Sequence, residues 1–553
     1  MGRGTDYRLS RENSMIADGQ RVPNGAVMSC DLCVVGGGAA GLSIGLEFVD
    51  GPGRVLLLEG GGLEFSAESQ ALYRGENAGL PYEDLASSRV RYLGGSTNRE
   101  GWGGWCKPLD ELDFRQRSWV PYSGWPLTAE ELIPYYERAQ GICQLGPYDY
   151  DLQSWQERLG PEALKVLPLA GRVITEIQQM SPPTRFGKVY REQLRRSTHV
   201  DVYLHSNAVE ILTTDNGARA TGVRVRTLGG TEYRVEARSV ILAAGGIENA
   251  RLLLSSRSVE TAGLGNRHDL VGRYFMDHIR VDAGRLVLRD PGISTDFYDP
   301  SATFIRRSRA RTGTYDPRLL AGSLTLSRET QQEEGLLSYR VWLVGHYTDY
   351  ESAGVKALRG LYLAMRDREL PTRPLGLMMD VAGDLRNVIP VLFDRFVRSR
   401  RRSHRLLVNI IEPEPNPASR VTILPERDVL GVPKVQVRWQ LGANVGRTLA
   451  RAHAILDREL TQAGLGELEH LYVDEGGLPQ PLRWVWHHMG TTRMHDDPRR
   501  GVVDRNCCVH GISNLFIAGS SVFPSCGNDM PTLTIVALAL RLADHLKNAE
   551  GLR

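Results

Sequence analysis

Two adjacent histidines near the C-terminal end of the sequence could carry out acid–base chemistry. His487 and His488 lie in the stretch Trp486–Met494, which reads WHHMGTTRM in a chain with only 13 histidines among 553 residues. Histidine titrates close to neutral pH, so its imidazole can take a proton from a substrate under physiological conditions. A histidine pair is also compatible with a purely structural turn, and the rest of the chain must distinguish the two readings.

A glycine-rich segment at the other end of the sequence predicts a dinucleotide site. An apolar run at residues 31–35 leads into the pattern G-x-G-x-x-G at residues 36–41, and a second apolar run at residues 55–58 ends at Glu59. In a strand–turn–helix–strand unit of this kind, the glycines make the turn and let the backbone approach a pyrophosphate. The carboxylate is placed to accept hydrogen bonds from ribose hydroxyls.

Further periodic segments predict the elements that must position these residues. We expect strands at residues 200–204, 222–225, 232–235, 239–244, 338–344, 406–411 and 515–518, and helices at residues 42–48, 128–142, 248–255, 352–402, 444–463 and from Pro531 onward. The glycine-rich stretch at residues 91–113 fits no regular structure and is expected to be a loop in contact with a flat or phosphorylated ligand.

Composition limits the classes of partner. A net charge of +2 does not favour nucleic acid, and no apolar run reaches the 18 residues that a membrane span requires. The first 29 residues are polar and resemble no signal peptide, and seven cysteines without a disulfide pattern favour the cytoplasm. The Cys-x-x-Cys spacing of Cys30 and Cys33 has no second pair at zinc-site spacing, so no metal is expected.

One dense basic run occurs between Arg395 and Arg405. It contains Arg398, Arg400, Arg401 and Arg402. A solvated helix end is the simpler interpretation of such a run, and an anionic docking site is the alternative.

Several motifs in a fixed order resemble the glucose–methanol–choline (GMC) family of flavin-dependent oxidoreductases. They are the N-terminal glycine pattern, LGGSTN and WGGWCKPLD near residue 100, Ala243–Gly246, Gly272–His278, HHMGTTRM, AGSSVFPSCG and PTLTIVALALRLADHL. The resemblance implies an α/β chain, α+β overall. A doubly wound FAD-binding domain would be built from discontinuous segments, and a substrate domain would contain a mainly antiparallel sheet with helices.

The resemblance also implies a division of the chain. Residues 1–125, 196–275 and 481–553 would form the FAD-binding domain, residues 126–195 would cover the substrate side, and residues 276–480 would form the substrate domain. The residues expected to bind the cofactor are Gly36, Gly38, Ala39, Ala40, Gly41, Glu59, Gly60, Gly94, Gly95, Ser96, Asn98, Trp102, Gly103, Gly104, Val209, Ala244, Gly245, Gly519, Ser520, Met530 and Thr532.

By the same resemblance, His487 accepts the hydroxyl proton of an alcohol while the carbinol hydride passes to flavin N5, with His488 as its neighbour. Relatives often carry a hydrogen-bonding residue where this chain has Met530, so Asn528 is a candidate to replace it. Asp529 is expected either to cap the final helix or to bind a cationic substrate group. No histidine occurs between Gly94 and Trp105, where some relatives attach the flavin covalently, so non-covalent FAD is expected.

The expected function is therefore FAD-dependent oxidation of a primary or secondary alcohol of a sugar, glycoside, aminosugar or polyol. The sequence leaves the electron acceptor open among oxygen, a quinone and a carrier. Two alternatives remain open at this stage. One is a lyase or isomerase of the same fold that keeps the flavin structurally, and the other is oxidation of a non-sugar alcohol.

Overall fold

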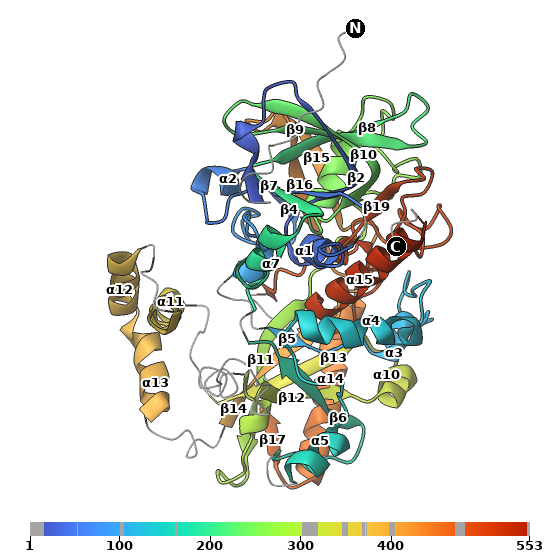
Figure 1. The fold of residues 1–553 in the computed structure, drawn as a ribbon. Helices are drawn as coiled ribbons and strands as arrows, with labels where there is room; N and C mark the ends of the chain where they lie inside the picture. The colour runs from blue at the N-terminus through green and yellow to red at the C-terminus, as the bar shows by residue number, and fades with distance from the viewer. Residues whose placement is uncertain are drawn as a thin grey trace.

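A computed structural model describes residues 16–51, 53–99, 104–160, 164–182, 184–300, 319–345, 352–367, 371, 373–396, 404–469 and 482–549. Two eight-stranded sheets lie at opposite ends of the molecule, and the final helix runs between them (Figure 1). The expected strand–turn–helix–strand unit is confirmed: β2 (Val27–Val35) leads into α1 (Ala39–Leu46), and β3 (Val55–Leu58) follows.

The first sheet is mainly parallel. Its strand order is β1 (Ile16–Asp18), β7 (Val200–Leu204), β3, β2, β10 (Glu232–Leu242), β9 (Ala220–Arg226) and β8 (Asn207–Thr213), and β19 (Leu515–Ile517) also pairs with β10. The pairs β2–β3, β3–β7 and β2–β10 are parallel, whereas β8, β9 and β10 form antiparallel pairs. The two short strands predicted at residues 232–235 and 239–244 are one strand, because no turn-forming residue separates them.

The second sheet is antiparallel. Its order is β17 (Gly466–Glu469), β11 (Ile279–Leu288), β14 (His404–Ile411), β13 (Tyr339–Val344), β12 (Leu320–Leu326), β6 (Val173–Met180) and β5 (Trp105–Cys106), with β18 (Arg483–Trp484) paired to β11. A third sheet contains β15 (Arg420–Arg427), β16 (Pro433–Trp439) and β4 (Gly75–Gly79). Each eight-stranded sheet contributes to its own hydrophobic core. The mixed α/β architecture agrees with the expected fold class.

Helices cover both large sheets and connect them. The α15 helix (Thr532–Ala549) packs against α1 and against α4 (Ala129–Ile142), and α14 (Asn444–Gln462) packs on the antiparallel sheet. The predicted capping box of α4 is present, because Thr128 Oγ1 accepts from Glu131 N and Glu131 Oε2 accepts from Thr128 N. The remaining helices of three or more residues are η1 (Gly19–Arg21), α2 (Ala67–Ala71), η2 (Gly95–Asn98), α3 (Glu111–Phe114), α5 (Leu152–Leu159), α6 (Phe186–Val189), α7 (Arg191–Arg196), α8 (Glu248–Ser255), η3 (Asp296–Tyr298), α10 (Arg328–Glu334) and η6 (Ser520–Val522).

Three strands cross the expected division of the chain. The β5 strand comes from the segment assigned to the first domain but joins the antiparallel sheet, and β18 does the same from the C-terminal segment. The β4 strand pairs in parallel with β16, which comes from the segment assigned to the second domain. Sheet membership therefore does not follow the expected segments at these strands.

The helical region expected at residues 352–402 consists of three helices in its described part. These are α11 (Ala353–Asp367), α12 (Pro374–Gly383) and α13 (Leu385–Phe396), and they pack mainly against one another. They project from the side of the molecule as a separate helical insert (Figure 1).

The packing of α1 on β2 depends on a glycine without a side chain. A Cβ atom at Gly41 would lie 1.9 Å from the carbonyl oxygen of Gly36, a backbone atom that cannot rotate away. We expect Gly41→Ala to lower the free energy of unfolding by about 1–3 kcal/mol through overpacking. Denaturant unfolding of the purified variant measures this change.

Gly141→Ala is the matched control. Gly141 lies within α4, and no atom lies within 4 Å of its ideal Cβ position. Alanine there should leave stability unchanged or raise it by roughly 0.5–1 kcal/mol, because glycine loses more backbone entropy in a helix. Equal effects of the two substitutions would contradict a specific contact between Gly41 and Gly36.

Candidate active site

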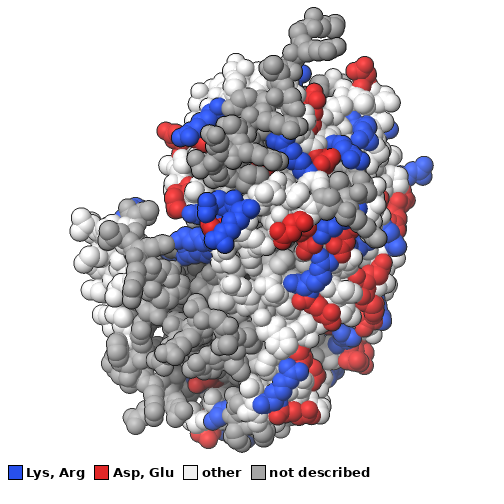
Figure 2. Space-filling view, viewed as in Figure 1, with Lys and Arg blue, Asp and Glu red and all other residues white. Residues whose placement is uncertain are grey.

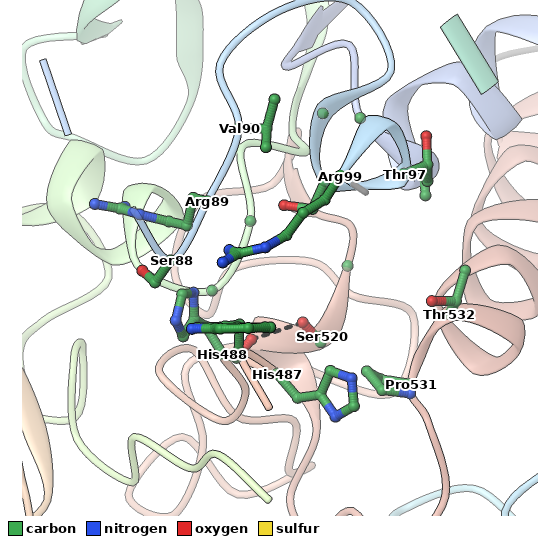
Figure 3. Close-up of a pocket in the computed structure, with 18 of the residues that line it drawn as sticks. Ser88, Arg89, Val90, Thr97, Arg99, His487, His488, Ser520, Pro531 and Thr532 are labelled. Atoms are coloured by element: carbon green, nitrogen blue, oxygen red, sulfur yellow. Dashed lines mark hydrogen bonds between the residues drawn. The ribbon is translucent and has the colours of Figure 1, made fainter. Parts of the chain in front are cut away.

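A cavity of about 1040 Å³ extends from the glycine turn of the parallel sheet to the two histidines. Its walls come from both eight-stranded sheets and from the loop between β15 and β16, so segments distant in sequence meet around it. Figure 3 shows His487 and His488 at one part of this cavity, with Arg89, Arg99 and Ser520 nearby and Pro531 and Thr532 at the start of α15.

The glycine turn offers backbone donors to an anion. Gly38 is the N-cap of α1 and provides no side-chain cap, so the first N–H groups of the helix are available to a phosphate. Gly38 lines the cavity, and an ideal Cβ there would meet no atom within 4 Å. A Cβ atom built at Gly95 would lie 3.1 Å from Gly38 Cα, which shows that η2 packs closely on this turn.

Glu59 ends β3 beside the turn. Its Oε2 atom accepts from Gly37 N at 2.9 Å and its Oε1 atom accepts from Gly61 N at 2.7 Å. The carboxylate is buried but lines the cavity, and each oxygen has lone pairs left for a ribose hydroxyl.

An apolar cluster lies along the same part of the cavity. Leu72, Val209, Leu430 and Val432 form it, and all four line the cavity wall. Apolar side chains of this kind suit a flat heterocycle such as adenine. Phosphate donors, a ribose acceptor and an apolar surface thus line the same cavity, and the residues present fit FAD.

Most residues expected to bind the cofactor line this cavity. They are Gly36, Gly38, Ala39, Ala40, Glu59, Gly60, Gly95, Ser96, Gly104, Val209, Ala244, Gly245, Gly519, Ser520, Met530 and Thr532. Gly41, Gly94 and Asn98 do not line it and instead support its walls, as when Asn98 Nδ2 donates to Leu93 O. Trp102 and Gly103 lie outside the described residues.

The backbone of the histidine pair is held by a buried carboxylate. Asp277 Oδ1 accepts from His487 N at 2.8 Å, and Asp277 Oδ2 accepts from Trp486 N at 3.1 Å and from the Tyr82 hydroxyl. Trp486 has a φ of 61°, in the left-handed region that a non-glycine residue rarely adopts. Burial raises the pKa of Asp277 to about 7, while these hydrogen bonds favour its charged form. Asp277 therefore fixes an unusual turn that presents His487 to the cavity.

A second histidine meets His487 directly. His278 Nδ1 lies 2.9 Å from His487 Nδ1, and His278 Nε2 lies 2.8 Å from the carbonyl oxygen of Gly527. A carbonyl oxygen only accepts, so His278 Nε2 carries a proton and, in a neutral ring, His278 Nδ1 is the acceptor. His487 Nδ1 must then donate, which leaves a lone pair on His487 Nε2. The contact selects the tautomer that a general base needs.

Both rings are neutral at physiological pH. Burial lowers the pKa of His278 to about 4. Burial also holds the pKa of His487 well below its usual 6.5, and the neighbouring His278, His488 and Arg340 lower it further. His487 thus keeps its free lone pair at neutral pH.

His488 is placed differently from His487. Its ring lies 5.7 Å from that of Phe275 and 6.2 Å from that of Tyr82, and its carbonyl oxygen accepts from Ser520 Oγ. Burial lowers its pKa well below 6.5. Its Nε2 atom is buried and has no hydrogen-bond partner among the described residues, although the ring lines the cavity. A ligand in the cavity could satisfy this nitrogen.

The roles expected for Asn528 and Asp529 do not fit their positions. Neither residue lines the cavity. The Asn528 carbonyl oxygen accepts from Arg340. Asp529 Oδ2 lies 3.0 Å from Lys107 Nζ, and Asp529 Oδ1 lies 3.2 Å from Arg340 Nη1. Two buried cations already offset the Asp529 charge, so it is an ion-pair partner rather than a receptor for a substrate amine.

The sequence reasoning missed the contact of His278 with His487. His278 was present in the segment Gly272–His278 that supported the family resemblance, but no role was assigned to it. A buried-type histidine directly before an apolar strand was the available signal. His278, and not Asn528, is the hydrogen-bonding partner of His487 in this structure.

Comparisons with known proteins agree with this arrangement. Residues 31–309 match the family described as FAD dependent oxidoreductase, and residues 415–539 match the family described as GMC oxidoreductase. The chain is 25% identical to 2-methyl-1,2-propanediol dehydrogenase of Mycolicibacterium austroafricanum, over 93% of this chain and 95% of that protein. It is 26% identical to paromamine 6'-oxidase of Streptomyces fradiae, over 82% and 77% of the two chains.

Solved structures show the same fold at low sequence identity. A variant of formate oxidase from Aspergillus oryzae RIB40 has a TM-score of 0.55 at 17% identity, covering 96% of this chain and 100% of the other. Pyridoxine 4-oxidase from Mesorbium loti has a TM-score of 0.54 at 18% identity, covering 94% and 99%. A parallel dinucleotide-binding sheet joined to an antiparallel substrate sheet defines the class of FAD-dependent oxidoreductases. Within that class, the chain belongs to the GMC oxidoreductase family, and it is an FAD-dependent alcohol oxidoreductase.

The contact between His278 and His487 can be tested by substitution. His278→Leu removes the acceptor that selects the His487 tautomer, so the rate of flavin reduction by substrate should fall on the order of 10- to 100-fold, as for other partners that orient a histidine. His278→Gln keeps a side-chain oxygen that can accept from His487 Nδ1, and it should recover most of the rate. Anaerobic stopped-flow absorbance measures both.

The pH profile distinguishes a role of His278 in positioning His487 from a general loss of folded structure. Because the pKa of His487 lies well below 6.5, protonation of this ring should slow flavin reduction only well below pH 6.5. We therefore expect that titration of His487 causes no change in the parent rate from pH 6.5 upward. His278→Leu should retain FAD and lose rate across that plateau. Equal loss in the Leu and Gln variants, or loss of FAD in both, would contradict the positioning role.

Proposed function

We propose that this enzyme oxidises an alcohol group of a sugar, glycoside, aminosugar or polyol, with His487 as the base that accepts the hydroxyl proton. The observation that carries the proposal is the neutral His487, with its tautomer selected by His278, in the wall of a large cavity. A base placed in this way can remove a hydroxyl proton without any other change of protonation.

The wall beside His487 suits a polyhydroxylated molecule. Trp105 and Trp342 lie 5.9 Å apart by ring centroid and both line the cavity. Indole rings offer flat apolar surfaces to the CH faces of a sugar. Three charged side chains that line the same cavity can hydrogen-bond hydroxyl groups: Arg280, Asp296 and Asp299.

The names of several relatives support this substrate class. They include paromamine 6'-oxidase, a C-glycoside 3-oxidase of Arthrobacter globiformis and the fructose dehydrogenase large subunit of Gluconobacter japonicus. The first would act on an aminosugar and the other two on sugars or their glycosides. The diol named for the Mycolicibacterium relative fits the polyol part of the proposal.

The residues of the site have different roles in the proposed reaction. Bound FAD supplies the acceptor for the two electrons of the carbinol hydride. His487 Nε2 accepts the hydroxyl proton, and His278 stabilises the resulting imidazolium by accepting a hydrogen bond from Nδ1. Asp277 keeps the His487 backbone in place, and Trp105 and Trp342 provide an apolar wall for the substrate.

Non-covalent attachment and a cytoplasmic location complete the proposal. The histidines that line the described part of the cavity are His487 and His488, and no histidine occurs in the segment between Gly94 and Trp105. All seven cysteines are free thiols, which supports a reducing compartment.

The test of function is anaerobic mixing of the yellow protein with sugars, aminosugars, polyols and simple alcohols. At least one polyhydroxylated compound should bleach the flavin. His487→Ala should slow that bleaching by a factor of roughly 10² to 10⁴, because it removes the general base. His488→Ala should be milder, since His278 contacts His487 and not His488.

Three results would contradict the proposal. Bleaching by simple alcohols alone would exclude the sugar class. Conversion of substrate without any bleaching would favour a lyase or isomerase that keeps the flavin structurally. A larger effect of His488→Ala than of His487→Ala would show that the base is the other histidine.

The attachment of FAD has its own test. Acid precipitation of the protein should leave the yellow colour in the supernatant, because no covalent bond is expected. Absorbance of the supernatant and of the redissolved pellet measures the partition. Flavin that stays with the washed, denatured protein would contradict non-covalent binding.

A further inference from the structure

The helical insert α11–α13 exposes an unusual concentration of apolar side chains. Seven of the fifteen exposed large hydrophobic residues among the described part of the chain lie in it: Met365, Leu375, Met378, Met379, Leu385, Ile389 and Leu392. Met365, Leu375 and Met379 are 80%, 76% and 73% exposed. Contiguous exposed apolar surface on a folded protein marks an interaction site more often than single exposed residues do.

These side chains follow helical spacing on two helices. Leu375, Met378 and Met379 are separated by three and four residues on α12, and Leu385, Ile389 and Leu392 have the same spacing on α13. Each set therefore forms one face. Val388 is fully buried. A Cβ atom built at Gly354 on α11 would lie 2.9 Å from Val388 Cγ2, so the opposite face of α13 packs on α11. The insert has a core of its own and still leaves apolar faces outside.

One carboxylate of the insert is held by hydrogen bonds within it. The Asp384 carboxylate, which is partly buried, accepts from Gly354 N at 3.0 Å and from Asn387 Nδ2 at 2.7 Å. Arg373 and Arg386 are exposed next to the apolar faces. In Figure 2 the visible described surface of the insert, on the left of the view, is mostly uncharged.

The composition of this segment differs from that of the rest of the chain. Residues 352–403, which end just before β14, contain 11 of the 67 Lys and Arg residues and 5 of the 65 Asp and Glu residues, a net charge of +6 that leaves −4 for the remainder. Four of these arginines, at positions 398, 400, 401 and 402, lie outside the described residues. Positive charge beside an apolar helix face is the pattern of helices that lie in the headgroup region of an anionic bilayer.

The insert is also connected to the active site. Val355, Lys356 and Leu358, near the start of α11, line the cavity. A helix of 15 residues is about 22 Å long, so the exposed Met365 near its end lies within that distance of the cavity wall.

We propose that the α11–α13 insert docks on the surface of a bilayer that contains anionic phospholipid. The apolar faces enter the headgroup region, and the exposed arginines contact lipid phosphates. None of the described helices is long and apolar enough to cross a membrane, so the contact is peripheral. The docked insert places one wall of the cavity close to the lipid. This inference does not depend on which alcohol is oxidised.

The test uses the full-length flavoprotein and extruded vesicles of phosphatidylcholine with about one-third phosphatidylglycerol, compared with phosphatidylcholine alone. We expect the protein to sediment with the anionic vesicles and to bind the neutral ones more weakly, with a loss of binding at high salt. The triple variant Leu375→Gln, Met379→Gln and Ile389→Gln should reduce the partition coefficient at least tenfold.

A matched triple variant changes exposed apolar residues elsewhere. Phe65→Gln, Val189→Gln and Val429→Gln remove side chains of 60%, 41% and 83% exposure outside the insert, and vesicle binding should not change. Flavin content and oxidation measured with a water-soluble acceptor should stay at parent levels in both variants, which shows that the fold is intact.

Two outcomes would overturn the proposal. Equal vesicle binding by the parent and the insert variant would show that the apolar faces do not contact lipid. Absence of vesicle binding, together with a parent dimer in sedimentation velocity that the insert variant converts to monomer, would show that a second copy of the chain covers these faces.

Discussion

The hydrogen bond between His278 and His487 determines what the active site can do. The two residues are 209 positions apart, and their Nδ1 atoms meet at 2.9 Å because β11 begins directly beneath the turn that carries His487. Asp277, the neighbour of His278, holds that turn by accepting from the backbone of Trp486 and His487. One dipeptide therefore sets both the position and the tautomer of the base. A rigid arrangement of this kind lets a neutral imidazole accept a proton without reorganisation.

A buried ion pair next to the site supports the peptide that contacts His278. Gly527 accepts from His278 Nε2 through its carbonyl oxygen, and its N–H donates to Glu412 Oε1 at 3.3 Å. Glu412 is paired with the fully buried Arg117, which lowers the pKa of Glu412, while burial and the nearby Glu412 raise the pKa of Asp113 to about 8. The pKa values of the two carboxylates are therefore shifted in opposite directions, and Arg117 pairs most closely with Glu412. Buried ion pairs add little net stability, and here their effect is to fix the Gly527 peptide that orients His278.

The cavity and the α11–α13 insert differ in how their side chains are packed. Around the cavity, glycines and small residues allow close backbone approach, and polar groups converge on a few positions. On the α11–α13 insert, the buried Val388 packs against α11 and the Asp384 carboxylate accepts from Gly354 N, while Leu and Met side chains remain outside. A soluble helix usually turns its apolar face to a core. The insert leaves apolar side chains of α12 and α13 exposed, and these are the faces that we propose to dock on a bilayer.

The sequence by itself determined the local features of this protein. The glycine pattern at residues 36–41, the capping box at Thr128 and the periodic runs at β7, α8, α14 and α15 were predictable, because each depends on residues that are neighbours in the chain. The motifs in their fixed order also identified the FAD-binding fold, and they predicted His487 as the base. The tertiary structure alone decided which side chains meet across long separations.

Three results show which features the sequence alone could not predict. Asp529 pairs with Lys107, 422 positions away, and this pairing rather than its place before α15 sets its role. His278 became the partner of His487 only through the packing of β11 under the C-terminal turn. The sequence predicted one helical region at residues 352–402, but not its division into α11, α12 and α13 or the exposure of apolar side chains on α12 and α13. Local patterns follow from backbone geometry and periodicity, whereas contacts between distant residues depend on how whole sheets and helices pack.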